Sequence, residues 1–268
     1  MKTHLKAWYR SGSWQFARDF LDDSRFAADR LATYHYRGHD IHYRPGSSDA
    51  RLIYEILLKP GYKSHYFLPG TLQPEMILDI GGNIGIAAIY LAHCYPGAKI
   101  HTFEPVPDNF ALLERNTAPY PAITAHHMAL GQEDGSMTMA KAGRNFGGCS
   151  LARDAVSAAE GIRVTLRHTA HILAELGIEQ ADIIKIDTEG YEYPILTSMP
   201  ESLLAHTTWI VGELHGCNDF KLLDYLEKWF FVDIKKTLNV SLANFHACNR
   251  SRLPSLQLSR RQIQQLQY

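Results

Sequence analysis

The stretch Ile77-Leu78-Asp79-Ile80-Gly81-Gly82-Asn83-Ile84-Gly85-Ile86-Ala87-Ala88-Ile89-Tyr90-Leu91-Ala92 decides the fold. It begins as a short apolar run, turns on three glycines and continues with helical spacing, which is the order of a nucleotide-binding βα unit. Glycine lets a ligand approach the backbone, and the following helix N-terminus offers free N–H groups. The loop reads D-x-G-G-x-x-G rather than G-x-G-x-x-G. An acid at Asp79 disfavours a pyrophosphate and suits a ligand with an amino group.

The next strand decides between a cofactor site and an ordinary tight turn. Residues Ala98 to Phe103 read as a strand that ends in Glu104. This acid follows the glycines by about 20 residues, where a carboxylate can bind the two hydroxyls of a ribose. The alternative is an ordinary solvated charge. The spacing favours the ribose-binding interpretation.

Bulk properties limit the class of protein. A chain of 268 residues can bury one large core, so we expect one domain with a lead-in. The 27 basic and 28 acidic residues give a net charge of −1, which argues against a nucleic-acid binder. No window resembles a membrane span or a signal peptide, which predicts a cytoplasmic protein. The four cysteines form no C-x-x-C pair, so we expect reduced thiols rather than a zinc site.

The N-terminal part differs in pattern from the rest. Residues 1–30 predict one or two amphipathic helices, which could cover a substrate pocket, pair two subunits in a homodimer or cap the sheet edge. Residues 34–44 predict a β-hairpin, and 45–49 supply an N-cap for a helix over 50–58. We therefore divide the chain into a lead-in and candidate substrate cap (1–74), a cofactor-binding domain (75–250) and a C-terminal tail (251–268).

From Met76 onward, strands and helices alternate, which predicts an α/β fold with a mostly parallel, doubly wound sheet and an antiparallel element at its end. Residues 136–153 read as a hairpin or mobile flap over the site. The remaining strands are expected over 122–130, 163–167, 181–187, 207–214, 231–234 and 240–245, and helices over 105–116, 171–176 and 220–229. Ligands of such sheets bind at the carboxyl ends of the strands, where Asp79, Glu104, Asp187 and Glu213 fall.

The second informative segment is Lys185-Ile186-Asp187-Thr188-Glu189-Gly190-Tyr191-Glu192. Alternation along a strand would send Lys185, Asp187 and Glu189 to one side. A lysine beside a carboxylate at a strand end is a candidate acid/base or substrate-orienting pair. The alternative is a salt bridge that only fixes the loop.

Together these motifs resemble the FkbM family of S-adenosylmethionine-dependent methyltransferases. The resemblance covers roughly residues 35–215 and rests on Arg44-Pro45-Gly46-Ser47-Ser48-Asp49, Leu78 to Gly85, Phe103-Glu104-Pro105 with Asn116, Ala129-Leu130-Gly131, and Ile184 to Glu192. It implies a class I, Rossmann-like methyltransferase that carries a methyl group to a hydroxyl of a sugar or natural product. Arg167-His168 departs from the family, which usually has an acid there, and the N-terminal helices lie outside the match.

The resemblance also implies roles for individual residues. Asp79 and the loop of Gly81, Gly82, Asn83 and Gly85 would hold the methionine part of the cofactor. Glu104 would hold its ribose, beside Pro105. The segment around Met128 and Ala129 would hold its adenine.

Methyl transfer to a hydroxyl needs an aligned acceptor and help in removing its proton, from a base or a metal. Asp187 and Glu189 are the first candidates, with Lys185 beside them. In Glu213-Leu214-His215, positions i and i+2 point to the same side, so His215 is a second candidate base. Alternatively, Asp187, Glu213 and His215 could ligate a divalent ion, or these carboxylates could anchor a substrate hydroxyl.

Two other classes of function remain open. A nicotinamide-dependent oxidoreductase also has a glycine loop and a ribose-binding acid, but the loop spacing, Asp79 and the lack of a second mononucleotide half disfavour it. A non-catalytic protein could keep the fold as an interaction surface, although the glycines and Glu104 are intact. The expected partner is a small-molecule or glycan acceptor.

Overall fold

A seven-stranded sheet forms the centre of the protein in the computed structural model, which describes residues 2–21, 30–59, 64, 66–140, 161–216, 218–236 and 243–254. The spatial order of its strands is β11-β12-β10-β9-β3-β4-β5. Their bounds are β3 Met76–Ile80, β4 Lys99–Phe103, β5 Ile123–His126, β9 Ile183–Ile186, β10 Trp209–Leu214, β11 Phe230–Lys236 and β12 Ala243–Asn249. Strands β5, β4, β3, β9 and β10 are parallel, and β12 is antiparallel to both β10 and β11. The predicted α/β class and mostly parallel sheet are confirmed.

The chain enters this sheet at its middle. Strand β3 is followed outward by β4 and β5, and the chain then returns to place β9 on the other side of β3. The strand order therefore reverses between β3 and β9. In open α/β sheets, ligands bind at the carboxyl ends of the strands beside such a reversal.

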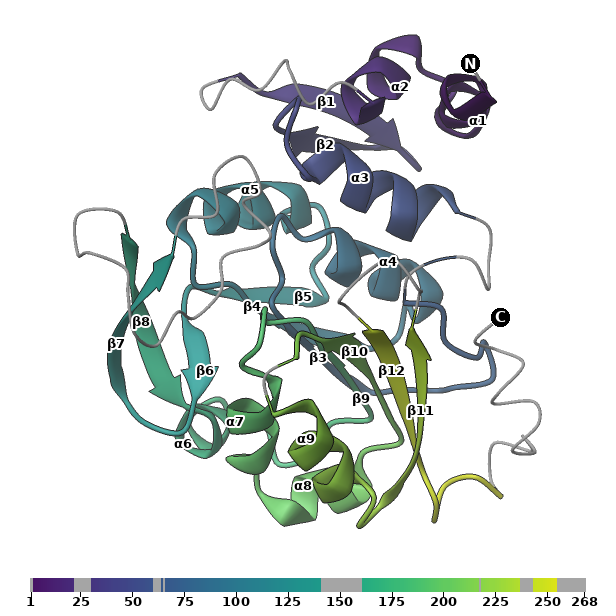
Figure 1. The fold of residues 1–268 in the computed structure, drawn as a ribbon. Coiled ribbons are helices and arrows are strands. Elements are labelled where there is room, and N and C mark those ends of the chain that lie inside the picture. The colour runs from purple at the N-terminus through teal and green to yellow at the C-terminus, as the bar shows by residue number, and fades with distance from the viewer. Residues whose placement is uncertain are drawn as a thin grey trace.

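Helices cover both faces of the sheet (Figure 1). Successive residues of one strand point to opposite faces, so Ile77 packs with α4 (Ile86–Cys94) and α5 (Pro107–Thr117), while Leu78 packs with the helices of the other face. Those helices are α6 (Thr169–Glu175), α7 (Glu192–Thr197), α8 (Glu201–His206) and α9 (Asp219–Leu226). The short helices α7 and α8 were not predicted individually.

The lead-in packs on the α4 side of the sheet. It contains α1 (Lys2–Ser11), α2 (Trp14–Leu21), β1 (Ala32–Tyr36), β2 (His39–Tyr43) and α3 (Asp49–Leu52), which continues as the π-helical turn η2 (Ile53–Leu58). Strands β1 and β2 form the predicted antiparallel hairpin. Phe16, Ile41 and Ile53 belong to the same buried cluster as Ile77, so the lead-in and the sheet share one hydrophobic core.

Helix α3 begins at Asp49, one residue before the predicted start. Ser48 makes no capping hydrogen bond, whereas Ser47 Oγ accepts from the N–H of Asp49 at 3.1 Å. The carboxylate of Asp49 instead accepts hydrogen bonds from Arg44 Nε and Nη2 at 2.8 and 2.9 Å, and both residues are buried. Because a buried guanidinium needs a fixed counter-charge, Asp49 serves Arg44 rather than the helix terminus.

A second, three-stranded sheet lies beside the main one (Figure 1). It is formed by β6 (Ala129–Gly131), β7 (Gly135–Ala140) and β8 (Gly161–His168) in the order β6-β8-β7. The predicted single strand over 122–130 was therefore wrong: the chain leaves the main sheet after His126 and enters the small sheet at Ala129. Of the predicted flap over 136–153, β7 supplies the start, and residues 141–153 lie outside the described part.

Some expectations concern the ends of the chain and its surface. The last strand, β12, continues beyond Phe245 to Asn249, and the predicted tail from Ser255 lies outside the described residues. Where described, the cysteines Cys94 and Cys248 are free thiols. None of the described helices is both long and apolar enough to cross a membrane. The cytoplasmic location, the homodimer and the lack of nucleic-acid binding stay predictions.

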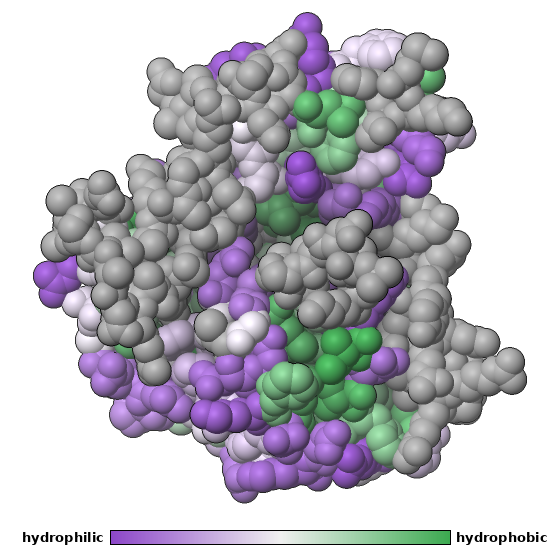
Figure 2. Space-filling model, viewed as in Figure 1, coloured by the Kyte–Doolittle hydropathy of each residue, from purple (hydrophilic) through white to green (hydrophobic). Residues whose placement is uncertain are grey.

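Apolar surface near α9 interrupts an otherwise largely hydrophilic lower face (Figure 2). Helix α9 carries Phe220, whose exposed fraction is 84%, and β11 carries the exposed Ile234. Isolated apolar residues on a surface are normal in soluble domains. We therefore assign no role to these two.

Replacing Gly82 by alanine should lower the free energy of unfolding by about 1–3 kcal/mol, the cost of overpacking a core. A Cβ on Gly82 would lie 2.2 Å from Thr102 Oγ1 and 2.6 Å from Leu113 Cδ1. Gly97→Ala is the control, because a Cβ added there would meet nothing within 4 Å. Urea denaturation measures both, and equal stabilities of the two variants would contradict the packing argument.

Candidate active site

The glycine loop packs tightly against the two strands beside it. The φ angles of Gly81, Asn83 and Gly85 are 82°, 49° and 89°. The N–H groups of Gly81 and Gly82 both donate to the carbonyl oxygen of Phe103, at 3.0 and 2.9 Å. A Cβ on Gly81 would lie only 1.8 Å from the carbonyl oxygen of Asp187. The N–H groups of Gly81 and Gly82 are therefore occupied by the neighbouring strand. The free N–H groups expected at the N-terminus of the following helix, α4, stay a prediction.

A buried ion pair lies directly beneath this loop. Lys185 Nζ is 3.1 Å from Asp79 Oδ1 and donates a 2.6 Å hydrogen bond to the carbonyl oxygen of Gly81. The other oxygen of Asp79 accepts from Thr102 Oγ1 at 2.8 Å. Burial alone would lower the pKa of Lys185, but the charges of Asp79 and Asp187 raise it above its usual value. Lys185 therefore stays protonated and holds the loop, which favours the fixing role over an acid/base role.

Glu104 lies at the end of β4 and faces the same loop. Its two carboxylate oxygens accept from the backbone N–H groups of Asn83 and Val106, each at 2.8 Å. The residue is 5% exposed. Burial raises the pKa of Glu104 to about 7, and its hydrogen bonds partly oppose this rise. The carboxylate is thus placed to hold the loop and to accept further hydrogen bonds from a ligand in the cavity.

The lead-in contributes to the position of Glu104 through Asn109. Arg44 Nη2 donates to Asn109 Oδ1 at 2.8 Å, and Asn109 Nδ2 points at Glu104 Oε1 at 3.5 Å. A guanidinium only donates and an ionised carboxylate only accepts, so Arg44 fixes the amide with its NH2 group toward Glu104. The buried Arg44 and Asp49 pair therefore supports the cofactor side of the site from the hairpin end.

The acidic loop after β9 forms the opposite wall. Strand β9 ends at Ile186, so the predicted strand alternation of Lys185, Asp187 and Glu189 was wrong. Glu189 has a φ of 55°, a left-handed backbone conformation that non-glycine residues rarely adopt. This turn keeps Glu189 beside Asp187, whose Oδ2 accepts a 2.7 Å hydrogen bond from Tyr66. Burial, followed by the charge of Asp187, raises the pKa of Glu189 to about 7.

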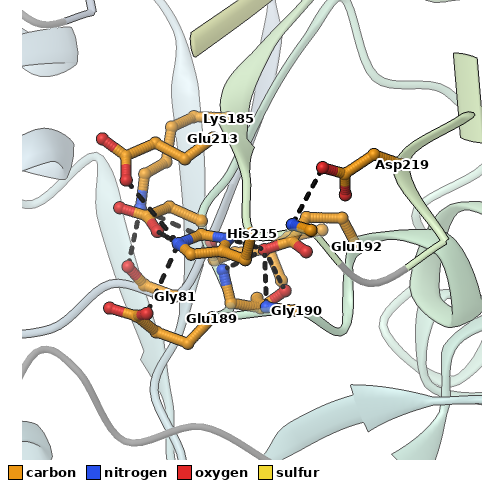
Figure 3. Close-up of polar contacts among 12 residues, drawn as sticks. Gly81, Lys185, Glu189, Gly190, Glu192, Glu213, His215 and Asp219 are labelled. Carbon is orange, nitrogen blue, oxygen red and sulfur yellow. Dashed lines mark hydrogen bonds and ion pairs between the residues drawn. The ribbon is translucent and has the colours of Figure 1, made fainter. Parts of the chain in front are cut away.

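His215 follows β10 and lies at the centre of several carboxylates (Figure 3). Its Nδ1 is 3.0 Å from Glu192 Oε1, and its Nε2 faces Asp187, Glu189 and Glu213 at 3.4–3.6 Å. Burial alone would lower the pKa of His215, but the hydrogen bond and charge of Glu192, with the charges of Asp187 and Glu189, raise it to about 9. The structure brings the three candidate metal ligands together: one ligand atom each of Asp187, Glu213 and His215 lies within 4.8 Å of the others.

A cavity of about 830 Å³, open mouth included, joins these walls. The predicted site residues that line it are Gly81, Gly82, Asn83, Glu104, Pro105, Met128, Ala129, Lys185, Asp187 and Glu189. The others are not among its lining residues: Asp79 and Gly85 lie behind the loop, and Glu213 and His215 lie behind Asp187 and Glu189. For Asp79, the structure supports an indirect role through Lys185 in place of direct contact with a ligand.

Sequence reasoning missed residues that complete the site. Tyr66 lines the cavity and binds Asp187 from 121 positions away, and no local pattern marks it. Leu52 and Ile56 add an apolar wall from the lead-in. Glu192 accepts hydrogen bonds from the N–H groups of Thr188 and Gly190. Its place in the motif that begins at Lys185 was a signal that could have found it.

Comparisons with known proteins identify the family. Residues 79–243 match the family model of the methyltransferase FkbM domain. The chain is 25% identical to the 31-O-demethyl-FK506 methyltransferase FkbM of Streptomyces tacrolimicus over 63% of this chain and 76% of that protein. It is 26% identical to the hexuronic acid methyltransferase AglP of Haloferax volcanii over 56% of this chain and 59% of that protein.

The fold also resembles a solved structure, a methyltransferase FkbM from Methylobacillus flagellatus. The TM-score is 0.51 at 17% identity, covering 70% of this chain and 48% of that one, so this likeness supports the fold alone. The chain spans only 9% and 59% of the lengths of two further curated relatives.

Replacing Lys185 by methionine should lower the free energy of unfolding by about 3–5 kcal/mol, because Asp79 would remain as a buried, uncompensated charge. Adding Asp79→Leu should recover part of this loss. Lys228→Met is the control, since Lys228 forms an exposed ion pair with Glu201 and should cost at most about 1 kcal/mol. Denaturant unfolding measures all three. A loss for Lys185→Met no larger than for Lys228→Met would refute the role of the pair.

Proposed function

This chain belongs to the family of the methyltransferase FkbM domain, and on that premise we propose that it transfers a methyl group from S-adenosylmethionine to a hydroxyl of a sugar or natural product. One observation carries the proposal. A single cavity at the carboxyl ends of β3, β4 and β9 is bordered by the glycine loop and Glu104 on one side and by Asp187 and Glu189 on the other. A cofactor and an acceptor hydroxyl can therefore meet there.

The residues of one wall fit S-adenosylmethionine. Glu104 can accept hydrogen bonds from ribose hydroxyls, and Asn83 Oδ1 is a buried acceptor that has no hydrogen-bond partner within the described chain. Met128, Ala129 and Val106 offer apolar surface for the adenine. When bound, the cofactor supplies an electrophilic methyl group. The chain itself holds the ribose through Glu104 and keeps the loop in place through Lys185.

The acidic wall suits an acceptor that presents a hydroxyl, rather than an anionic group, to Asp187 and Glu189. Asp187 and Glu189 line the cavity, while the positive charge of Lys185 already faces Asp79 and the carbonyl of Gly81. A hydroxyl can donate its proton to such a carboxylate. The names of the two relatives, which refer to a 31-O-demethyl compound and to a hexuronic acid, also support an oxygen-containing acceptor.

The proton of the acceptor hydroxyl would pass to a carboxylate of this wall. Glu189 has a pKa of about 7 and can be ionised near neutral pH, so it is a suitable base. Tyr66 holds Asp187 by its hydroxyl and fixes the direction in which Asp187 can accept. His215, with its pKa of about 9, is protonated at neutral pH unless another cation replaces that proton.

The lead-in supports the proposal of a substrate cap over residues 1–74. Leu52, Ile56 and Tyr66 come from this part of the chain and line the cavity together with residues of the sheet. π-Helical turns such as η2, which carries Ile56, are frequent at functional sites. The acceptor would therefore contact the lead-in as well as the loops of the sheet.

The nicotinamide-dependent alternative lacks support at the same loop. A dinucleotide needs backbone N–H groups for its pyrophosphate. Those of Gly81 and Gly82 donate to Phe103, and that of Asn83 donates to Glu104.

Calorimetry with purified protein distinguishes the methyltransferase from the nicotinamide-dependent alternative: we expect saturable binding of S-adenosylhomocysteine, the demethylated product, and no binding of NAD. The reverse result would overturn the proposed function.

The affinity for S-adenosylhomocysteine should fall as the pH drops through about 7. Glu104 has a pKa of about 7 in the free protein, and only the ionised form accepts two hydrogen bonds from the ribose. Glu104→Gln should bind about 1–3 kcal/mol more weakly at pH 8 and lose this pH dependence. Calorimetric titrations from pH 6 to pH 8.5 test both, and parallel profiles of the two proteins would exclude Glu104 as the titrating group.

Asp187→Asn should reduce turnover far more than cofactor affinity, because Asp187 faces the acceptor side. Tyr66→Phe, which removes the hydroxyl that holds Asp187, should have a smaller effect in the same direction. Transfer of a labelled methyl group to a mixture of candidate polyols, followed by mass spectrometry, measures turnover. Equal losses of turnover and affinity would make Asp187 structural. No methylated product from the wild-type protein would favour the non-catalytic alternative.

A further inference from the structure

Three carboxylate oxygens surround Nε2 of His215. Asp187 Oδ1, Glu189 Oε2 and Glu213 Oε2 lie 3.6, 3.4 and 3.6 Å from this nitrogen. These distances are longer than N–H···O hydrogen bonds, which measure about 2.7–3.2 Å. Ligand atoms about 2.1 Å from one cation are separated by roughly 3.0–3.4 Å at adjacent octahedral or tetrahedral positions. The observed spacing is thus closer to that of ligands around a shared ion than to that of direct bonds.

The other ring nitrogen of His215 is already fixed. Nδ1 lies 3.0 Å from Glu192 Oε1, which also accepts from the N–H of Thr188 at 2.9 Å. The His215 side chain is 5% exposed, and Nε2 is buried and has no hydrogen-bond partner in the described part of the chain. A histidine whose Nδ1–H is held by a carboxylate presents the lone pair of Nε2. Metal-binding histidines commonly have this outer partner.

One carboxylate oxygen of Asp187 is held by a hydrogen bond, and the other faces Nε2 of His215. Tyr66 donates to Oδ2, while Oδ1 faces His215. Within the described residues, the nearby Lys185 is paired with Asp79 and bonded to the Gly81 carbonyl. The cluster therefore gathers carboxylates around an imidazole whose ring can carry at most one positive charge.

We propose that Asp187, Glu213 and His215 Nε2 bind a divalent cation, with Glu192 as the residue that positions His215. A set of several carboxylate oxygens and one imidazole suits Mn²⁺ or Mg²⁺ better than metals that prefer thiolates. The cation would share Asp187 with the cavity. Its task there, to bind the acceptor hydroxyl and lower the pKa of that group, rests on the proposed function; the binding itself does not.

The test uses the full chain without cofactor. Mn²⁺ binding is followed by the loss of the free-ion signal in electron paramagnetic resonance, at one fixed pH. We expect one site per chain in the wild type. Asp187→Asn and His215→Gln should each weaken binding at least about tenfold. Glu192→Gln, which leaves the three ligands themselves unchanged, should weaken it by about 10–100-fold. Circular dichroism and the affinity for S-adenosylhomocysteine check that each variant is folded.

The matched control is Asp134→Asn, which removes another carboxylate that contacts a histidine. Asp134 Oδ2 is 2.9 Å from His171 Nδ1 at an exposed site, and this variant should bind Mn²⁺ like the wild type. The proposal is overturned if the wild type shows no saturable Mn²⁺ site up to millimolar concentration, or if Asp187→Asn and His215→Gln bind as tightly as it does. Retained affinity for S-adenosylhomocysteine in those cases would leave the proposed function standing.

Discussion

The buried pair of Lys185 and Asp79 is the interaction on which the arrangement of the site depends. Asp79 belongs to β3 and Lys185 to β9, and these strands adjoin at the point where the strand order reverses. The ammonium group reaches the carbonyl oxygen of Gly81 at 2.6 Å. One side chain thus joins both central strands to the glycine loop, and a partner lost from this buried pair would leave an uncompensated charge.

The positions of the two walls of the cavity depend on this ion pair. Because Gly81 lies against the backbone of Asp187, the loop that faces the cofactor and the loop that faces the acceptor are held at a fixed separation. Each wall then receives support from the lead-in, through Arg44 and Asn109 toward Glu104 and through Tyr66 toward Asp187. The lead-in is therefore part of the site as well as part of the core.

Local patterns predicted the fold well because the responsible interactions are local. The apolar spacing around Gly81 and Gly85 predicts β3 and α4, and the position of Glu104 after β4 follows from the parallel register. Interactions between residues distant in the sequence could not be predicted from such patterns. The partner of Lys185 is Asp79 and not the nearby Asp187, and β9 ends at Ile186, before the left-handed turn at Glu189. Neither could be predicted from spacing alone, because burial and loop closure depend on residues distant in the sequence.

The central claim is that one cavity places a sulfonium cofactor against an acceptor held by the acidic loop. A crystal structure with bound S-adenosylhomocysteine measures this directly. The account predicts the ribose hydroxyls at Glu104, the adenine near Met128 and Ala129, and the sulfur facing open space bordered by Asp187 and Glu189. A ligand bound elsewhere on the protein, or a sulfur that points away from the acidic loop, would contradict it.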